Sequence, residues 1–155
     1  MLSSAVSRGA CTAASIRVRS ASLDNFLRVS GLGRADIIKM DLEGAEPMAL
    51  AGARAALSTA RVLIFEVNEP QLRELGIAPV ALVEETARAG EFDTVYFIDE
   101  RSETIHEWTP PDFDEALNSY KFINVVCSRS NSVSPAELTS PRAVVSSACH
   151  EASPR

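Results

Sequence analysis

The stretch Asp36-Ile-Ile-Lys-Met-Asp-Leu-Glu-Gly-Ala-Glu46 decides how the rest of this 155-residue chain is interpreted. It begins with a short apolar segment, Ile37 to Met40, which is typical of a β-strand. Carboxylates follow closely, at Asp41, Glu43 and Glu46. Pro47 then stands where only the first turn of a helix tolerates proline. A strand that leads through an acidic turn into a helix is typical of open α/β sheets, which bind ligands beyond the carboxyl ends of their strands.

A second segment, Val62 to Glu69, has the same arrangement. The run Val62-Leu-Ile-Phe65 is apolar without alternation, which predicts a strand buried on both faces, as in a parallel sheet covered by helices. Polar residues follow at Glu66, Asn68 and Glu69. Because the carboxyl ends of neighbouring parallel strands lie about 5 Å apart, both acidic clusters are expected to face one cleft. Such carboxylates can hold a hard cation, accept a proton from a hydroxyl group or bind a polar ligand.

Several of these side chains also have a purely structural interpretation. Glu43 and Glu46 could do no more than complement the dipole of the following helix. Asn68 could orient a ligand or cap the next turn. Lys39 lies inside the strand from Ile37 to Met40 and needs a partner, because burying an unpaired ammonium group is costly. A pair with Glu66 or Asp36 is the simplest expectation. Asp41 and Glu66 each close an apolar strand, which favours a functional role for both.

The order of the predicted elements indicates an α/β fold. A strand at 16–19 precedes a helix that Ser22 caps and that ends at Gly31 and Gly33. After the strand from Ile37, short helices run to Ala51 and over 54–58, with Gly52 expected as a left-handed cap. The strand from Val62, a helix over 79–90 and a strand over 92–98 follow. A polar loop is expected over 99–111 and a last strand over 122–127. This alternation predicts a mostly parallel sheet with an antiparallel pair at one edge.

The two ends of the chain differ in composition from its centre. Residues 1–15 contain serine, alanine and arginine but no acid, which indicates either an unstructured start or an organellar presequence. Residues 128–155 are rich in serine, alanine and proline, and we expect a disordered tail. The domain is therefore expected over residues 16–127.

Charge and cysteine usage exclude several classes of protein. Residues 1–35 hold five arginines and one acid, whereas the rest holds ten basic and twenty acidic residues. An acidic body disfavours phosphate contacts, so nucleic acid is not an expected partner. No apolar run approaches the roughly 18 residues that suggest a membrane span. Cys11, Cys127 and Cys149 are odd in number and widely spaced, which favours free thiols in a reducing compartment, the cytoplasm, over disulfides or zinc. No metal site is expected from His106 or His150.

Several of these motifs, taken together, resemble the signature of a known protein family. The run from Asp36 to Glu46, followed by Met48-Ala-Leu-Ala-Gly-Ala53 and Ile64-Phe-Glu-Val-Asn68, resembles the signature of the FkbM family of S-adenosylmethionine-dependent methyltransferases. The step Ser22-Leu-Asp24 is similar to the Thr-Leu-Asp that leads into this signature. The likeness covers about residues 16–127. It implies a Rossmann-like methyltransferase fold, with O-methyl transfer to a hydroxyl group of a small molecule such as a sugar or natural product.

The resemblance also implies roles for individual residues. Asp41 would lie near the sulfonium of the cofactor and near the methyl acceptor. Glu43 and Glu46 would line the same rim, and Glu66 would close the adjacent strand. These four are the candidate catalytic residues, with Asp41 also the candidate for cofactor contact and Asn68 for substrate contact. Methyl transfer chiefly needs positioning, exclusion of water and a group that accepts the hydroxyl proton.

One part of the family pattern is missing from the sequence. Complete members begin with a strand and a glycine-rich turn for the cofactor, whereas Gly31-Leu-Gly33 here follows a predicted helix. The amino-terminal half of the Rossmann-like sheet is therefore expected to be absent, and cofactor binding by this chain alone to be weak or nil.

Three hypotheses follow for the function. The first is a truncated methyltransferase domain. The second is a non-catalytic remnant that acts as an interaction module and self-associates through the edge where the missing strands would pack. The third is a carboxylate metal site for hydrolysis, suggested by the acidic clusters alone.

Overall fold

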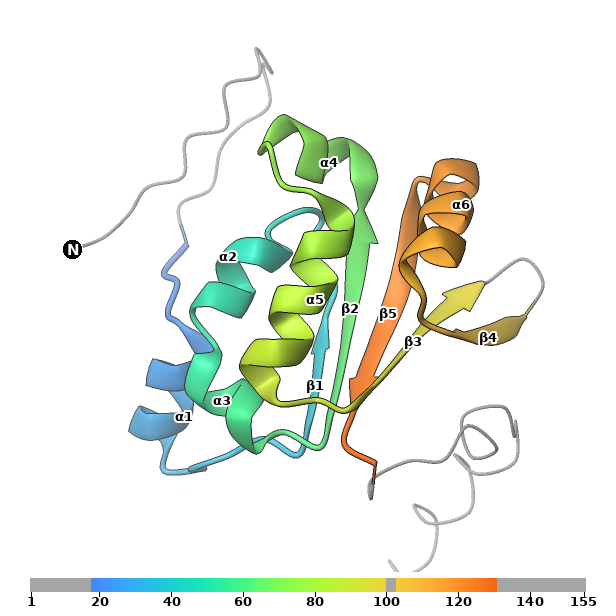
Figure 1. Ribbon diagram of the computed structural model, residues 1–155. Coiled ribbons are helices and arrows are strands. Elements are labelled where there is room, and N and C mark those ends of the chain that lie inside the picture. The colour runs from blue at the N-terminus through green and yellow to red at the C-terminus, as the bar shows by residue number, and fades with distance from the viewer. Residues whose placement is uncertain (1–17, 100–102, 131–155) are drawn as a thin grey trace, which may run out of the picture.

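The structure is a computed structural model that describes residues 18–99 and 103–130 of the chain (Figure 1). The predicted leader over 1–15 and nearly all of the predicted tail lie outside the described residues. The described part contains these helices and strands, in chain order: α1 (Leu23–Ser30), β1 (Ile37–Met40), α2 (Glu46–Ala51), α3 (Arg54–Thr59), β2 (Val62–Asn68), α4 (Glu69–Glu74), α5 (Pro79–Gly90), β3 (Thr94–Asp99), β4 (Thr104–Glu107), α6 (Pro110–Tyr120) and β5 (Phe122–Ser128).

The strands form a five-stranded sheet in the order β1-β2-β5-β3-β4. Only β1 and β2 pair in parallel; the other pairings, β2–β5, β5–β3 and β3–β4, are antiparallel. The prediction of a mostly parallel sheet was therefore wrong. The reason is the position of β5, which lies between β2 and β3. Without β5, the crossover through α5 would place β2 and β3 side by side as a parallel pair.

The expected antiparallel pairing of β3 with β5 is present, but it lies inside the sheet. The edge strand at this side of the sheet is β4. Both β4 and the start of α6 fall within the segment that was predicted to be a polar loop. Thr109 caps α6 by accepting a hydrogen bond from the Asp112 amide, and Phe113 and Leu117, four residues apart, are both buried. These local signals were present in the sequence and were missed.

The amino-terminal part differs from expectation in two further details. Val18 and Arg19 form no strand, and the other residues of that predicted strand lie outside the described part. Ser22 does cap α1, accepting a hydrogen bond from the Asn25 amide, and Gly31 ends it in the left-handed region at φ 73°. Gly52 follows α2 as expected, but at φ −92°, so the predicted left-handed cap was wrong there.

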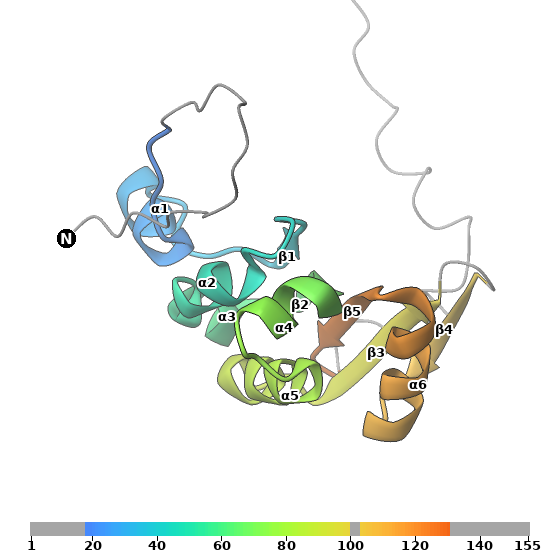
Figure 2. The ribbon, with the colours of Figure 1, turned by 90° about the horizontal axis from the view of Figure 1, so that it is seen from above.

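Helices α2 to α6 all lie on one face of the sheet, and no described helix covers the opposite face (Figure 2). Alternate residues of β2, Leu63, Phe65 and Val67, point into the layer beneath these helices and are fully buried. Ile64 and Glu66 point the other way and are only partly buried, because a strand alternates its side chains between faces. The expectation of a strand covered on both faces holds for one face of the described part.

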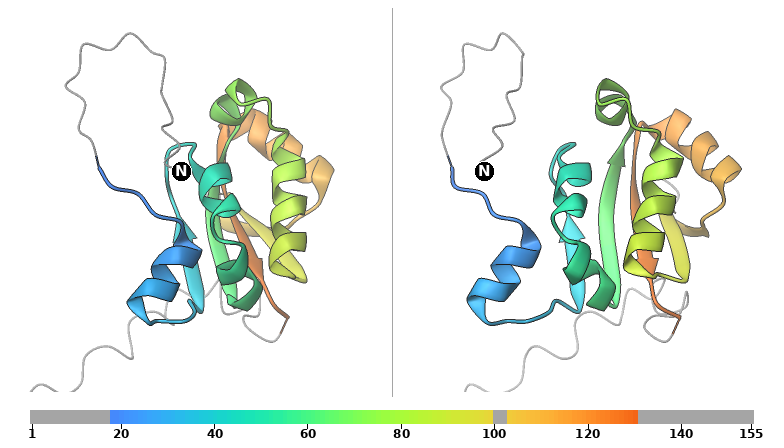
Figure 3. Two further views of the ribbon diagram at one scale, coloured as in Figure 1. Left: turned by 90° about the vertical axis from the view of Figure 1, so that its left-hand side faces the viewer. Right: turned by 60° about the vertical axis from the view of Figure 1, so that its left-hand side comes forward.

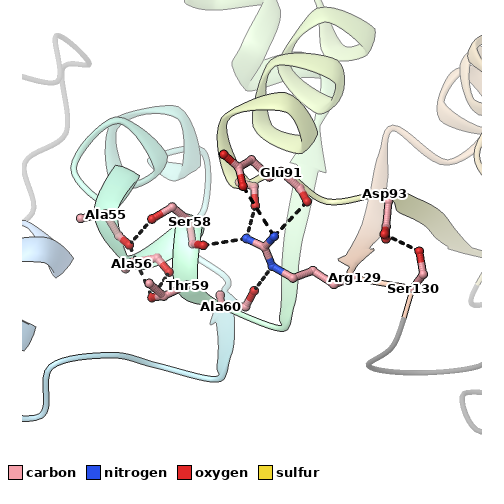
Figure 4. A network of polar contacts seen from close by, with 10 residues as sticks. Ala55, Ala56, Ser58, Thr59, Ala60, Glu91, Asp93, Arg129 and Ser130 are labelled. Atoms are coloured by element: carbon pink, nitrogen blue, oxygen red, sulfur yellow. Dashed lines mark hydrogen bonds and ion pairs between the residues drawn. The ribbon is translucent and has the colours of Figure 1, made fainter.

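Arg129 binds several backbone segments together at the end of the sheet where β2 begins (Figure 4). Its guanidinium donates to the carbonyls of Ser58, Ala60, Gly90 and Glu91, at 2.7, 3.0, 2.6 and 3.2 Å respectively. The same group lies over the Phe92 ring, 5.6 Å from its centroid. We call this group of contacts the Arg129 clasp. It joins the end of α3 and the end of α5 to the residue that follows β5.

Candidate functional site

The turn after β1 is built around the carboxylate of Glu46. This side chain is 2% exposed, and it accepts hydrogen bonds from the backbone amides of Leu42 at 2.6 Å and Gly44 at 2.8 Å. Charge-assisted bonds of this kind offset the cost of burying a carboxylate. Both oxygens of Glu46 are thus engaged in the turn, so the side chain shapes the rim that the sequence analysis expected it to line.

Two residues of this turn adopt the left-handed region. Glu43 lies at φ 51° and Gly44 at φ 92°. A Cβ added to Gly44 would lie 1.9 Å from Oε1 of Gln71, so the site has no room for a side chain. The strain at Glu43 and the close approach of α4 at Gly44 fix the path of the backbone after Asp41. Glu43 itself remains exposed.

Asp41 forms an ion pair with Lys39 at 3.1 Å, and both side chains are more than half exposed. Lys39 was expected to pair with Glu66 or Asp36, and that expectation was wrong. Asp36 pairs instead with Arg34, also at 3.1 Å. Because β1 is the edge strand and its outer face is open, the ammonium group of Lys39 stays in water and needs no buried partner.

Glu66 is the side chain whose electrostatics the fold alters most clearly at this end of the sheet. Partial burial raises the pKa of its carboxyl above the ordinary value, and the charges of Asp41, Glu43 and Glu46 raise it further. A hydrogen bond from the Asn68 side chain acts in the opposite direction. Because the charges of Asp41, Glu43 and Glu46 all act on Glu66, these four carboxylates lie at one rim, whereas Glu69 is ion-paired with Arg73.

Asn68 has one of the two roles that the sequence left open, because it caps the next helix, and it also contacts Glu66. Its Oδ1 accepts a hydrogen bond from the Gln71 amide at 3.4 Å and so caps α4. Its side-chain hydrogen bond with Glu66 leaves the amide group as the donor. One residue therefore ends β2, starts α4 and holds the carboxylate of Glu66 in place.

The sheet adds a residue that the sequence analysis did not select, Asn124 of β5. It lies directly opposite Glu66 in the β2–β5 register. Met40 lies opposite Phe65, so Asp41, one position later, comes level with Glu66 on the other side. Asp41, Glu66 and Asn124 therefore form a row across three strands. The available signal was an asparagine inside an apolar strand, the same kind of exception that drew attention to Glu66.

The described residues offer neither a metal site nor a membrane span. No group of three or more histidine, cysteine, aspartate or glutamate side chains within 18–99 and 103–130 is placed to hold a metal ion. Among the same residues, no helix is both long and apolar enough to cross a membrane.

The arrangement defines a class of protein: an α/β domain with an acidic rim at the carboxyl ends of two parallel strands. The sequence model of the methyltransferase FkbM domain matches residues 3–119, and the chain belongs to this family. No curated protein and no solved structure gives a significant match.

The family implies S-adenosylmethionine as methyl donor, and the described residues fit only one side of that molecule. A carboxylate rim suits the positive charge of a sulfonium. The described glycines, however, form no cradle for the rest: Gly31 and Gly33 follow a helix and face open space, while Gly44 is filled by Gln71 and Gly90 by Phe92. The described part therefore does not fit the whole cofactor.

Proposed function

We propose that this chain carries the acceptor side of an S-adenosylmethionine-dependent methyltransferase that acts on a hydroxyl group of a small molecule. The observation that supports the proposal most directly is the row of Asp41, Glu66 and Asn124 at the rim, in a chain that belongs to the FkbM methyltransferase family. The cofactor side of the cleft comes from polypeptide beyond the described residues. In this sense the domain is truncated.

Glu66 is the proton acceptor in this proposal. The hydroxyl proton of the acceptor passes to a carboxylate oxygen of Glu66 as the hydroxyl oxygen becomes the nucleophile. A carboxyl whose pKa is raised by burial and by neighbouring carboxylates is a stronger base than an ordinary glutamate. Asn68 orients that carboxylate through its hydrogen bond, and Asn124, on the adjacent strand, contacts the acceptor. Asp41 supplies negative charge beside the reacting centre.

The test uses methyl transfer from radiolabelled S-adenosylmethionine to a panel of sugars and hydroxylated small molecules. The protein for this assay is the chain supplemented with the upstream half of its domain. Asp41→Ala is expected to abolish transfer, and Glu66→Gln to lower it by about 10²- to 10⁴-fold. Asp114→Ala, an exposed carboxylate on α6, is the matched control and should leave the rate unchanged. Full turnover by Asp41→Ala would place the site elsewhere.

Cofactor binding by the chain alone is tested separately, by calorimetric titration with S-adenosylmethionine. Weak or absent binding is expected, because the described glycines form no cradle. Tight binding would overturn the truncation and leave the assignment of the acceptor side standing.

A second function, an interaction module, is favoured by one specific observation. Most of the large exposed apolar side chains come from residues 18–48, and four of them, Phe26, Ile37, Leu42 and Met48, line one open groove beside β1; the others are Val18, Val29 and Leu32. Only Leu75 and Phe122 lie elsewhere in the described part. A patch of this kind marks a contact surface.

A further inference from the structure

Lys121 lies in the turn between α6 and β5, at the same end of the sheet as the acidic rim. Its carbonyl accepts a hydrogen bond from the Glu69 amide at 2.8 Å, which joins this turn to the residue that follows β2. Phe122, the next residue, lies opposite Asn68 in the β2–β5 register. Views from the β1 side show the end of β2, helix α4 and the start of β5 together at one end of the sheet (Figure 3). Lys121 is therefore a neighbour of the proposed acceptor site.

The backbone of Lys121 adopts a conformation that favours glycine. It lies in the left-handed region, at φ 68° and ψ −20°, where helices commonly end in a glycine because a side chain is strained there. The Lys121 amide donates to the Leu117 carbonyl at 2.8 Å and so closes α6, which a glycine would do without strain. A lysine also complements the negative end of α6, whose last turn holds no basic residue. The two effects on stability have opposite signs, so stability alone does not explain a lysine at this position.

The side chain of Lys121 is exposed, and its ammonium group forms no ion pair with any described residue. Glu69, whose amide binds to this turn, pairs with Arg73 instead. The other lysine of the chain, Lys39, pairs with Asp41. The rim therefore carries carboxylates over β1 and β2 and, beside the start of β5, a positive charge that the described part does not neutralise.

The first residues of β5 connect Lys121 to the row that contains Glu66. Asn124 lies opposite Glu66, and Phe122 comes two positions before it, so all three share one face of the sheet. The Phe122 side chain is 52% exposed and offers an apolar surface between the row and the lysine. At about 3.3 Å per residue, Lys121 lies about 10 Å along the strand from Asn124. A flexible lysine side chain and a ligand with one sugar ring or aromatic ring can together bridge this distance.

We propose that Lys121 binds an anionic group, a carboxylate or a phosphate, on the hydroxylated acceptor. The inference rests on the proposed function, in which Glu66 and Asn124 form the site for the hydroxyl group. The carboxylates of Asp41 and Glu66 repel an anionic group at their end of the site, and the ammonium group of Lys121 attracts it at the other end. The acceptor is thereby held in one orientation, with its hydroxyl group at Glu66. The substrate class is a sugar acid, a sugar phosphate or a similar anionic hydroxyl compound, in preference to a neutral sugar.

Three compounds with one sugar scaffold test the proposal: galactose, galacturonate and galactose phosphate. Their binding to the full chain is measured by NMR titration without cofactor. The two anions are expected to bind about fivefold more tightly than galactose, because a lysine acts on both as a point charge. Lys121→Gly should remove this preference and keep α6 folded, since glycine suits the left-handed turn, whereas Lys121→Arg should retain the preference. Arg88→Ala removes an exposed cation near the opposite end of β2 and is the matched control, which should bind all three compounds like the unaltered chain.

Methyl transfer by the chain supplemented with the upstream half of its domain gives a second readout. Lys121→Gly should raise KM for the two anions about fivefold and leave kcat and the KM for galactose unchanged. Equal binding of all three compounds, or an anion preference that Lys121→Gly leaves intact, would overturn the inference and leave the proposed function standing. An anion preference that Lys121→Gly removes, without transfer to any of the three compounds, would count against the proposed function and support the anion site. Circular dichroism of each variant checks that the fold is retained.

Discussion

The two ends of strand β2 lie in opposite polar environments. At its amino-terminal end, the Arg129 clasp gives four carbonyl oxygens a shared cationic donor. At its carboxyl end, partial burial raises the pKa of the Glu66 carboxyl, and the charges of Asp41, Glu43 and Glu46 raise it further. At the first end the carbonyl oxygens are paired with a cation, whereas at the second end the carboxylates repel one another. Stability is concentrated at the first end, and the chemistry that we propose requires the second.

The largest effect on stability is expected from opening the clasp. Arg129→Ala would leave four carbonyl groups without their donor and remove the contact with the Phe92 ring. A loss of roughly 2–4 kcal/mol in the free energy of unfolding is expected, measured by urea denaturation. Arg88→Ala, at an exposed arginine in α5, should change it by less than about 0.5 kcal/mol. Equal effects for the two variants would remove the distinction between the ends of β2.

A smaller loss is expected from removing Glu46, the buried carboxylate of the acidic rim. Glu46→Ala leaves the partly buried amides of Leu42 and Gly44 without their carboxylate acceptor, which should cost about 1–3 kcal/mol. Glu43→Gln alters an exposed side chain in the same turn and should have little effect. The comparison is again made by urea denaturation, and a neutral Glu46→Ala would show that the turn holds without its buried carboxylate.

At the acidic end of β2, the contribution of Glu66 to stability should decline as the pH rises. The folded state raises the pKa of Glu66 above its ordinary value of 4.5, so it binds that proton more tightly than the unfolded state. The stabilising contribution of Glu66 is complete below that ordinary value and declines as pH rises through the folded-state pKa. Glu66→Gln should therefore be more stable than the unaltered chain at neutral pH, by less than about 1 kcal/mol because solvent screens the site.

This advantage should vanish on acidification below the ordinary pKa. Thermal unfolding of both proteins across the acid-to-neutral range measures it. A difference that does not change with pH would mean that Glu66 is not repelled by its neighbours.

The smallest effect concerns the thiol near the clasped end. Burial raises the pKa of Cys127 to about 12, so the folded protein should present almost no reactive thiolate there. In a variant with Cys11 and Cys149 changed to serine, iodoacetamide should label Cys127 only as fast as the protein opens. The Arg129→Ala variant should be labelled faster, whereas Glu66→Gln should not. Rapid labelling of the unaltered fold would contradict tight packing at this end.

The sequence predicted strands β1 and β2 and the acidic residues that follow them better than it predicted the order of the sheet. The alternation of apolar runs with acidic turns located β1, β2 and the rim, because burial and turn chemistry are local properties. The position of β5 could not be derived in this way, since strand order depends on which distant segments complete the core. Asn124 was missed for the same reason: its place opposite Glu66 follows from the register of that late strand. Lys39 was mispaired because its ammonium group was expected to be buried, whereas it is exposed.

Strand β5 also bears on how the molecule is made. It is the last strand of the described part of the chain, yet it lies between β2 and β3. Until the ribosome has released the residues up to Ser128, the β1–β2 unit and the β3–β4 hairpin have no described strand to join them. The sheet therefore closes only after the residues up to Ser128 have been made, and its assembly depends on contacts between distant parts of the chain, which slow folding. A nascent chain that stalls before Phe122 would expose two unjoined halves to chaperones and proteases.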